Sequence, residues 1–136
     1  MGTWAVDSFG NDDACDWTYE IEKSQDLSPV ENALNAVLNS GDSGVESYEA
    51  TNAIAAIEVI ARLQGNWGER SAYSERLDNW VEANQIQPST DLVQKAHLAI
   101  DHILAGNSEL HELWKESRDY EAWLASVADL KNRVNL

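Results

Sequence analysis

The sequence predicts an all-α protein, a single compact bundle of six to seven helices around a central apolar helix at about 47–64. Apolar residues recur at spacings of three and four along the chain, and no run of β-branched residues alternates with polar ones. The central helix carries alanine, isoleucine and valine around nearly its whole circumference, which places it inside the molecule. A chain of 136 residues has room for one hydrophobic core, so we expect a single domain over 1–136.

The first helix should begin near residues 11–13 and run to about Lys23. Ala14, Trp17 and Ile21 form one apolar stripe along it. Asparagine and aspartate at its start can accept hydrogen bonds from first-turn amides and suit the positive end of the helix dipole.

The second helix has a well-marked beginning. Ser28 is expected to cap it, Pro29 to occupy its first position, and Glu31 to complete a capping box. Its core face contains Val30, Ala33, Leu34, Val37 and Leu38, and the glycines within 41–44 end it.

Breaks in the apolar pattern separate the remaining helices. Pro88 ends one segment, Gly106-Asn107 ends the next, and Ser108 is expected to cap the helix after that. The Ser-Arg-Asp stretch at 117–119 indicates a stop and then a new start, which favours two helices in the tail. The predicted ranges are about 75–84, 90–105, 109–114 and 120–134.

The charge balance restricts the classes of partner. The chain has 24 acidic and 9 basic residues, a formal charge of -15 and a pI near 4.3. Such a field repels phosphate backbones and anionic membranes, so we expect neither nucleic acid nor a membrane as partner. A basic protein or a cation would be attracted, although acidity also serves solubility alone.

Cysteine content and the amino-terminal sequence favour a cytoplasmic location. Cys15 is the single cysteine, so no intrachain disulfide can form. The first residues lack the basic and apolar regions of a signal peptide. The most apolar stretch, 53–61, is interrupted by Glu58 and is too short to span a bilayer.

The opening of the chain resembles a known bacterial family. It reads Met-Gly-Thr-Trp at 1–4 and Phe-Gly-Asn-Asp-Asp-Ala at 9–14, and Asp16 and Trp17 come soon after. This pattern is similar to the family named domain of unknown function 4259, as are the stretch 53–65 and the tail from 108 to 130. The resemblance implies a helical fold and a bacterial cytoplasmic protein, and it brings no activity with it.

Three carboxylates close together, Asp12, Asp13 and Asp16, are the most suggestive polar group near the start. They could hold a hard cation through oxygen ligands, but their spacing is not that of a calcium-binding loop. The favoured interpretation is a helix cap in which Asn11 or Asp12 closes the first turn and Trp4 packs over it.

Glu58 stands in the middle of the apolar central helix, where an unpaired ionised carboxylate would be very costly. It could be an acid or base with a raised pKa, or it could accept hydrogen bonds from the Trp4 indole or backbone amides, or pair with an arginine such as Arg62. We favour a structural pairing. The candidate cluster comprises Trp4, Asn11, Asp12, Asp13, Asp16, Trp17 and Glu58.

Two further candidates lie elsewhere. His97 has Asp101 one turn later, an offset that could orient an imidazole for proton transfer or metal binding, although an edge-of-core histidine is favoured. Trp67 lies between Gly65 and Gly68 in a predicted loop, where it could be an exposed partner-binding residue or a plug over the central helix.

No motif of an enzyme family accompanies these residues, so we expect no catalytic residues and no cofactor. The expected function is a non-enzymatic protein-interaction module, in one version an immunity or antitoxin protein that acts on a basic partner. The alternative is a small metal-binding protein or hydrolase that uses Glu58, His97, Asp101 and the Asp12/Asp13 pair.

Overall fold

Seven helices make up the described part of the chain, and no strand occurs among those residues. The computed structural model describes residues 12–40, 44–68, 74–105 and 108–135, with side chains of the first helix from residue 16 on. The helices are α1 (Asp12–Glu22), α2 (Ser28–Leu38), α3 (Ser47–Leu63), α4 (Glu75–Ala83), α5 (Thr90–Ile103), α6 (Glu109–Lys115) and α7 (Tyr120–Arg133). The predicted all-α class is confirmed.

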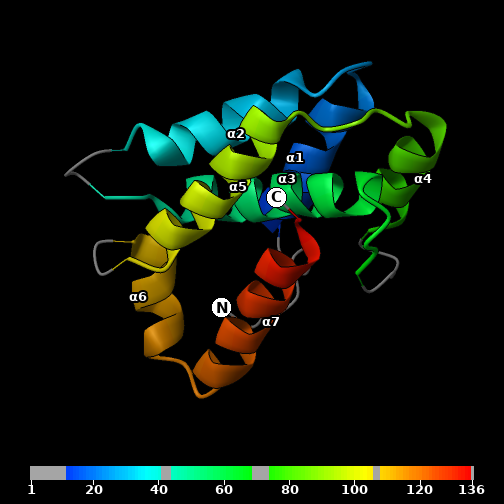
Figure 1. Ribbon diagram of the computed structural model, residues 1–136. Coiled ribbons are helices and arrows are strands. Elements are labelled where there is room, and N and C mark those ends of the chain that lie inside the picture. Colours follow the sequence, from blue (N-terminus) through cyan, green and yellow to red (C-terminus); the bar gives the residue numbers. More distant parts are fainter. Residues whose placement is uncertain (1–11, 41–43, 69–73, 106–107, 136) are drawn as a thin grey trace.

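Helix α3 is the centre of the molecule. It is buried continuously from Ala53 to Arg62 and packs against each of the other helices. In Figure 1 it runs across the middle of the view, with α2 along it and α6 and α7 descending from it as a hairpin. Its nearly complete apolar surface explains this position, because every face of the helix needs a neighbour. None of the described helices has the length and apolar character needed to cross a membrane.

The beginning of α2 differs from the prediction. Ser28 is the first helical residue, the N-cap position is Leu27, and no side chain caps it there. The Asp26 carboxylate instead accepts a hydrogen bond of 3.0 Å from the Ser28 amide. That bond, with further ones from the Ser28 and Ser24 hydroxyls, lowers the pKa of Asp26. The predicted capping box of Ser28 and Glu31 is therefore wrong, because the preceding carboxylate is the nearer and stronger acceptor.

The end of α3 shows why a glycine comes directly after it. Gly65 has a φ of +87°, in the left-handed region that side chains disfavour. The Gly65 amide donates to the Arg62 carbonyl and the Asn66 amide donates to the Ala61 carbonyl, each at 2.9 Å. This pair of bonds is a Schellman motif, and it closes the last turn of α3 and turns the chain toward Trp67.

A reciprocal contact joins the start of α3 to the start of α6. The Ser47 amide donates to Glu109 Oε1 at 2.7 Å, and the Glu109 amide donates to the Val45 carbonyl at 2.8 Å. Ser108 caps α6 as predicted, with its hydroxyl accepting from the His111 amide. A side chain from α6 thus satisfies an amide in the first turn of α3, a role that residues next to a helix usually perform.

This contact makes stability depend on pH. The hydrogen bonds from Ser47 lower the pKa of Glu109 from its ordinary value of 4.5. A carboxyl whose folded pKa is lowered stabilises the fold above its ordinary pKa and loses that contribution as the pH falls. We expect Glu109→Gln to lower the free energy of unfolding at pH 7 and to have a diminishing effect as the pH falls below 4.5. Urea unfolding of both proteins across this range measures the difference. The exposed Glu121→Gln is the matched control, and an equal effect at every pH would contradict the assignment.

Candidate functional site

Glu58, in the middle of α3, lies at the centre of a buried group of charges. Its side chain is almost fully enclosed, with 5% of the residue exposed. Both of its oxygens face the guanidinium of Arg133, with Nη1 to Oε1 and Nη2 to Oε2 each at 2.9 Å. Arg62, one turn along α3, donates a third hydrogen bond to Oε1. The predicted pairing of Glu58 with an arginine is confirmed, and a second arginine joins it.

Arg62 links Glu58 to another buried carboxylate. Its Nε donates to Asp78 Oδ1 on α4 at 2.7 Å, and the Ser74 hydroxyl donates to Asp78 Oδ2 at 2.8 Å. Arg62 is 2% exposed and Asp78 is 5% exposed. Buried charges need partners of opposite sign and hydrogen bonds to their remaining atoms. This group has two carboxylates and two guanidiniums, so its formal charges cancel.

Arg133, at the end of α7, completes the group from the far end of the chain. Its Nε also donates to Asp129 at 2.8 Å. Burial opposes the charge of Arg133, but the hydrogen bonds and charges of Glu58 and Asp129 outweigh that effect and raise the pKa of the guanidinium. A methyl group at Gly68 would lie 2.6 Å from Arg133 Nη1, so the absence of a side chain there makes room for the guanidinium. We refer to Glu58, Arg62, Asp78 and Arg133 as the ion network.

The residues around the ion network hold the last part of the chain. The Gln64 side chain and the Asn135 backbone exchange two hydrogen bonds of 2.8 Å. The Asn66 side-chain amide donates to the Arg133 carbonyl at 2.8 Å. From α5, His97 Nε2 contacts the Val134 carbonyl at 2.7 Å, so this nitrogen carries the proton. Glu58 and His97, two residues that the sequence offered as chemical candidates, therefore fasten consecutive residues of one segment.

The pairing of His97 with Asp101, which the sequence offered as the less favoured alternative, does not occur in the structure. Asp101 forms an ion pair of 3.0 Å with Lys131 on α7, and His97 binds the backbone instead. Asp101 lies on the exposed side of α5, where Lys131 of α7 is its partner, whereas His97 faces the C-terminal segment. The helical offset between the two residues permits a contact, but each finds a partner on a neighbouring element.

Trp67 is partly buried and packs against the hydrophobic core. Its ring lies 5.6 Å from the guanidinium carbon of Arg62, a distance typical of a cation–π contact. This position corresponds to the plug over the end of α3. The exposed aromatic residues of the described chain are instead Tyr19, 45% exposed, and Tyr48, 50% exposed.

The amino-terminal candidates divide between the described and undescribed parts. Trp17 is buried in the core, and Asp16 is exposed. Trp4 and Asn11 lie outside the described residues, as do the side chains of Asp12 and Asp13. Among the described residues, no group of three or more histidine, cysteine or acidic side chains is arranged to hold a metal ion. Glu58, His97 and Asp101 each face a different partner, so they share no common ligand position.

Asp78, Gly68 and Arg133 belong to the site but were not identified from the sequence. Asp78 is buried beside Leu77 in α4, but α4 is rich in charged and amide residues, so an aspartate there did not stand out as Glu58 does in α3. Arg133 offered no signal either, because it lies in an ordinary charged stretch and meets Glu58 across 75 positions of the sequence.

Removing the shared arginine should strongly destabilise the protein. Arg62→Met keeps a long side chain but removes the guanidinium that lies between Glu58 and Asp78, and breaking buried ion pairs in this way costs about 3–5 kcal/mol. The matched control is Lys131→Met, which removes the exposed pair with Asp101 and should cost less than about 1 kcal/mol. Urea unfolding of both variants gives the two values. Equal losses of stability in the two variants would show that the buried ion pairs of Arg62 contribute no more than the exposed pair of Lys131 with Asp101.

Gly65 and Gly68, which both follow α3, should respond differently to substitution by alanine. Gly68→Ala collides with the Arg133 guanidinium and should cost about 1–3 kcal/mol, a cost that Arg133→Ala removes in the double variant. Gly65→Ala meets no atom within 4 Å but places a side chain at φ +87°, so its cost of about 1–2 kcal/mol should persist in both backgrounds. Double-mutant cycles by urea unfolding test this. A coupling energy between Gly65 and Arg133, or the absence of one between Gly68 and Arg133, would contradict this prediction.

Comparison with known proteins gives a family and no activity. No curated protein and no solved structure matches the chain. The family model described as domain of unknown function 4259 matches residues 2–126, which include Glu58, Arg62 and Asp78 but end before Arg133. The match covers most of the chain, in agreement with the opening motif. The protein therefore belongs to the family of domain of unknown function 4259.

Proposed function

We propose that the protein is a cytoplasmic, non-enzymatic interaction module whose acidic surface binds a basic protein. The observation that carries this proposal is how the charges are divided between interior and surface. The chain has only nine basic residues, and two of them, Arg62 and Arg133, are in the ion network with Glu58 and Asp78. These four side chains are formally neutral as a set, and the other carboxylates whose exposure the structure describes lie at least partly exposed.

Exposed carboxylates that form no ion pair within the described part of the chain support the same proposal. Glu20, Asp91, Glu112 and Glu121 are exposed and form no ion pair within the described part of the chain. Exposed basic residues are few in the described chain, and one of them, Arg76, is already paired with Glu22. Uncompensated surface charge of one sign steers a partner of opposite sign and raises the rate of association.

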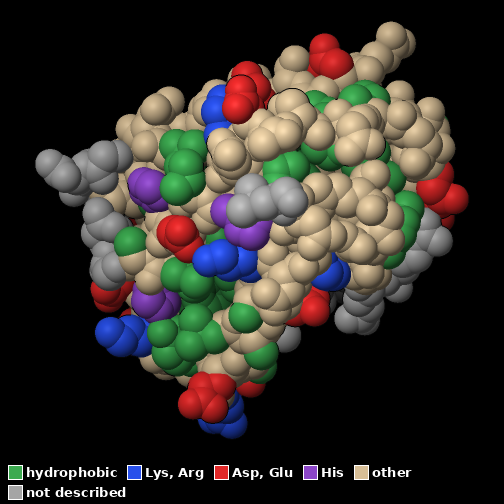
Figure 2. Space-filling view, in the orientation of Figure 1, with side chains coloured by type: hydrophobic (Ala, Val, Ile, Leu, Met, Phe, Trp, Pro, Cys, Tyr) green, Lys and Arg blue, Asp and Glu red, His purple; other side chains and the backbone are tan. Residues whose placement is uncertain are grey.

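The face of the molecule in Figure 2 bears on where a basic partner would bind. Acidic and basic side chains lie next to each other there, and hydrophobic groups gather over α6 and α7. Lys131 on α7 forms an ion pair of 3.0 Å with Asp101 on α5, so their two charges cancel. A basic partner gains little from such a mixed surface, which favours a binding surface elsewhere on the molecule.

A basic toxin held inactive by this chain is one specific form of the proposal. An acidic protein offers such a toxin the charge that its own target would offer, and association between opposite charges is fast. The ion network and the packed α3 would keep the surface rigid, which reduces the entropy lost on binding.

The test is the salt dependence of a purified complex. The tagged chain captures partners from its source cells, and the association rate with each purified partner is measured at about 0.1 M and about 1 M salt, where the Debye length falls from about 10 to about 3 Å. We expect a basic partner whose association slows by about tenfold or more. A partner with net negative charge, or a rate that salt does not change, would overturn the proposal.

A further inference from the structure

A tyrosine and a histidine form a close pair in the hairpin of α6 and α7. The Tyr120 hydroxyl, at the start of α7, lies 2.6 Å from His111 Nε2 on α6. Their rings are stacked, with centroids 5.6 Å apart and planes inclined at 25°. Both side chains are partly exposed, and neither contributes to the ion network. The pair therefore forms a polar group separate from the residues that anchor the end of the chain.

A backbone carbonyl fixes which nitrogen of His111 carries the proton. His111 Nδ1 lies 3.1 Å from the Ala105 carbonyl, just after α5. A carbonyl oxygen only accepts, so Nδ1 donates, and Nε2 of the neutral imidazole is then the acceptor. The Tyr120 hydroxyl thus donates to Nε2 and has no other hydrogen-bond partner in the described part of the chain. A hydroxyl that donates to a base, itself oriented by a third group, is the arrangement of an activated nucleophile.

The rings around His111 favour the charge that it gains when it takes the tyrosine proton. The Trp123 ring is stacked on His111, with centroids 6.0 Å apart and planes inclined at 26°. Trp114 stacks in turn on Trp123, with centroids 5.9 Å apart. An imidazolium over an indole face gains a cation–π attraction, and the formal charge of -15 on the chain also favours a cation. These surroundings assist proton transfer from the hydroxyl to Nε2.

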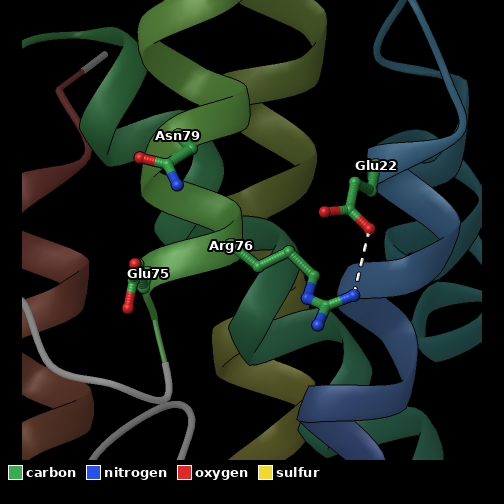
Figure 3. Close-up of a pocket in the computed structure, with 4 residues that line it drawn as sticks. All are labelled: Glu22, Glu75, Arg76 and Asn79. Atoms are coloured by element: carbon green, nitrogen blue, oxygen red, sulfur yellow. Dashed lines mark hydrogen bonds and ion pairs between the residues drawn. The ribbon is translucent and has the colours of Figure 1, made fainter.

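The other tyrosines of the described chain are more exposed but have no base beside them. Tyr48 is 50% exposed, and the charge of Glu49 is the main cause that raises the pKa of its hydroxyl. Tyr19 is 45% exposed, and the Arg76 guanidinium carbon lies 4.1 Å from the centre of its ring. Arg76 is held there by Glu22, at 3.2 Å (Figure 3). Neither hydroxyl forms a hydrogen bond with a described residue, so exposure and activation predict opposite orders of reactivity.

We propose that Tyr120 is a site of acyl modification, at which its hydroxyl takes an acyl group from an uncharged activated donor while His111 acts as the base. The Tyr120 oxygen attacks the carbonyl carbon of the donor, and its proton moves to His111 Nε2. The bond from that carbon to the leaving group then breaks, and the proton passes from Nε2 to the leaving group. The products are a tyrosine ester and a neutral histidine.

The charge of the chain selects the class of donor. A formal charge of -15 repels phosphorylated and nucleotide donors, whereas it does not oppose an uncharged acyl group. The modification is independent of the proposed binding of a basic protein, because it depends on the contacts of Tyr120 and His111 alone.

N-acetylimidazole, an uncharged acyl donor, tests the proposal on the purified full chain. Mass spectrometry of the derived peptides gives the rate of acetylation at Tyr19, Tyr48 and Tyr120. We expect Tyr120 to react about tenfold faster than Tyr48 or more, although it is less exposed, because a positioned base accelerates such steps by about 10²–10⁴-fold in enzymes. A Tyr120 that reacts no faster than Tyr48 would overturn the proposal.

A variant of each of two histidines identifies the base. His111→Gln keeps a polar side chain but cannot take the proton, so the rate at Tyr120 should fall about tenfold or more while the rate at Tyr48 stays unchanged. His102→Gln is the matched control, because His102 Nδ1 also contacts a backbone carbonyl, that of Leu98 at 2.8 Å, and it should leave Tyr120 unchanged. Equal effects of the two variants would overturn the role of His111. Circular dichroism checks folding, and if His111→Gln does not fold, the ratio of the Tyr120 and Tyr48 rates in the parent chain decides.

The anionic donor acetyl phosphate tests the preference for an uncharged donor. For each donor, the rate at Tyr120 is divided by the rate of free N-acetyl-tyrosinamide. We expect a smaller ratio for acetyl phosphate than for N-acetylimidazole, because the negative chain repels the anion. Equal ratios would overturn this part of the proposal.

Discussion

A carboxylate in the middle of the central apolar helix is the constraint on which much of this structure depends. The helices packed around α3 enclose Glu58, and burying its charge without a partner would cost a large amount of free energy. Its compensation draws Arg62 from the same helix and Arg133 from the last turn of α7. Arg62 also pairs with Asp78 from α4, and the Arg133 guanidinium lies against Gly68, where a Cβ would be 2.6 Å from Nη1. One polar residue in the core thereby fixes where α3, α4 and α7 meet.

This constraint also explains why Glu58 and His97 do not face a common ligand position. Glu58 binds two guanidiniums, and His97 donates to the Val134 carbonyl. Both hold the end of the chain against α3 and α5, together with Gln64. A buried carboxylate and a histidine often mark an active site, but structural ion networks perturb and bury such groups as well. Here their partners identify an anchoring role.

Interior and surface follow different electrostatic rules in this protein. Inside, the two carboxylates and two guanidiniums of the ion network cancel, since uncompensated charge is costly at low dielectric. Outside, an excess of carboxylate costs little, because water and salt screen it.

The sequence by itself determined the helical class, the central position of α3 and most helix ends. These properties arise from apolar periodicity and from capping residues, which act over one or two turns. It also indicated that Glu58 needed a partner, because a charge in an apolar stripe is costly wherever the chain goes. The start of α2 was misread even so, since Asp26 and Ser28 both fit the local pattern and only geometry chooses between two nearby acceptors.

Only the tertiary structure decided which groups meet. Arg133 lies 75 positions from Glu58, and Glu109 lies 62 positions from the amide that it caps. Tyr19 and Arg76 stack from separate helices, and His97 and Asp101 bind separate partners despite a favourable offset. Such pairings depend on how helices pack and on the competing partners that packing supplies, and neither is encoded in the spacing of residues along one helix.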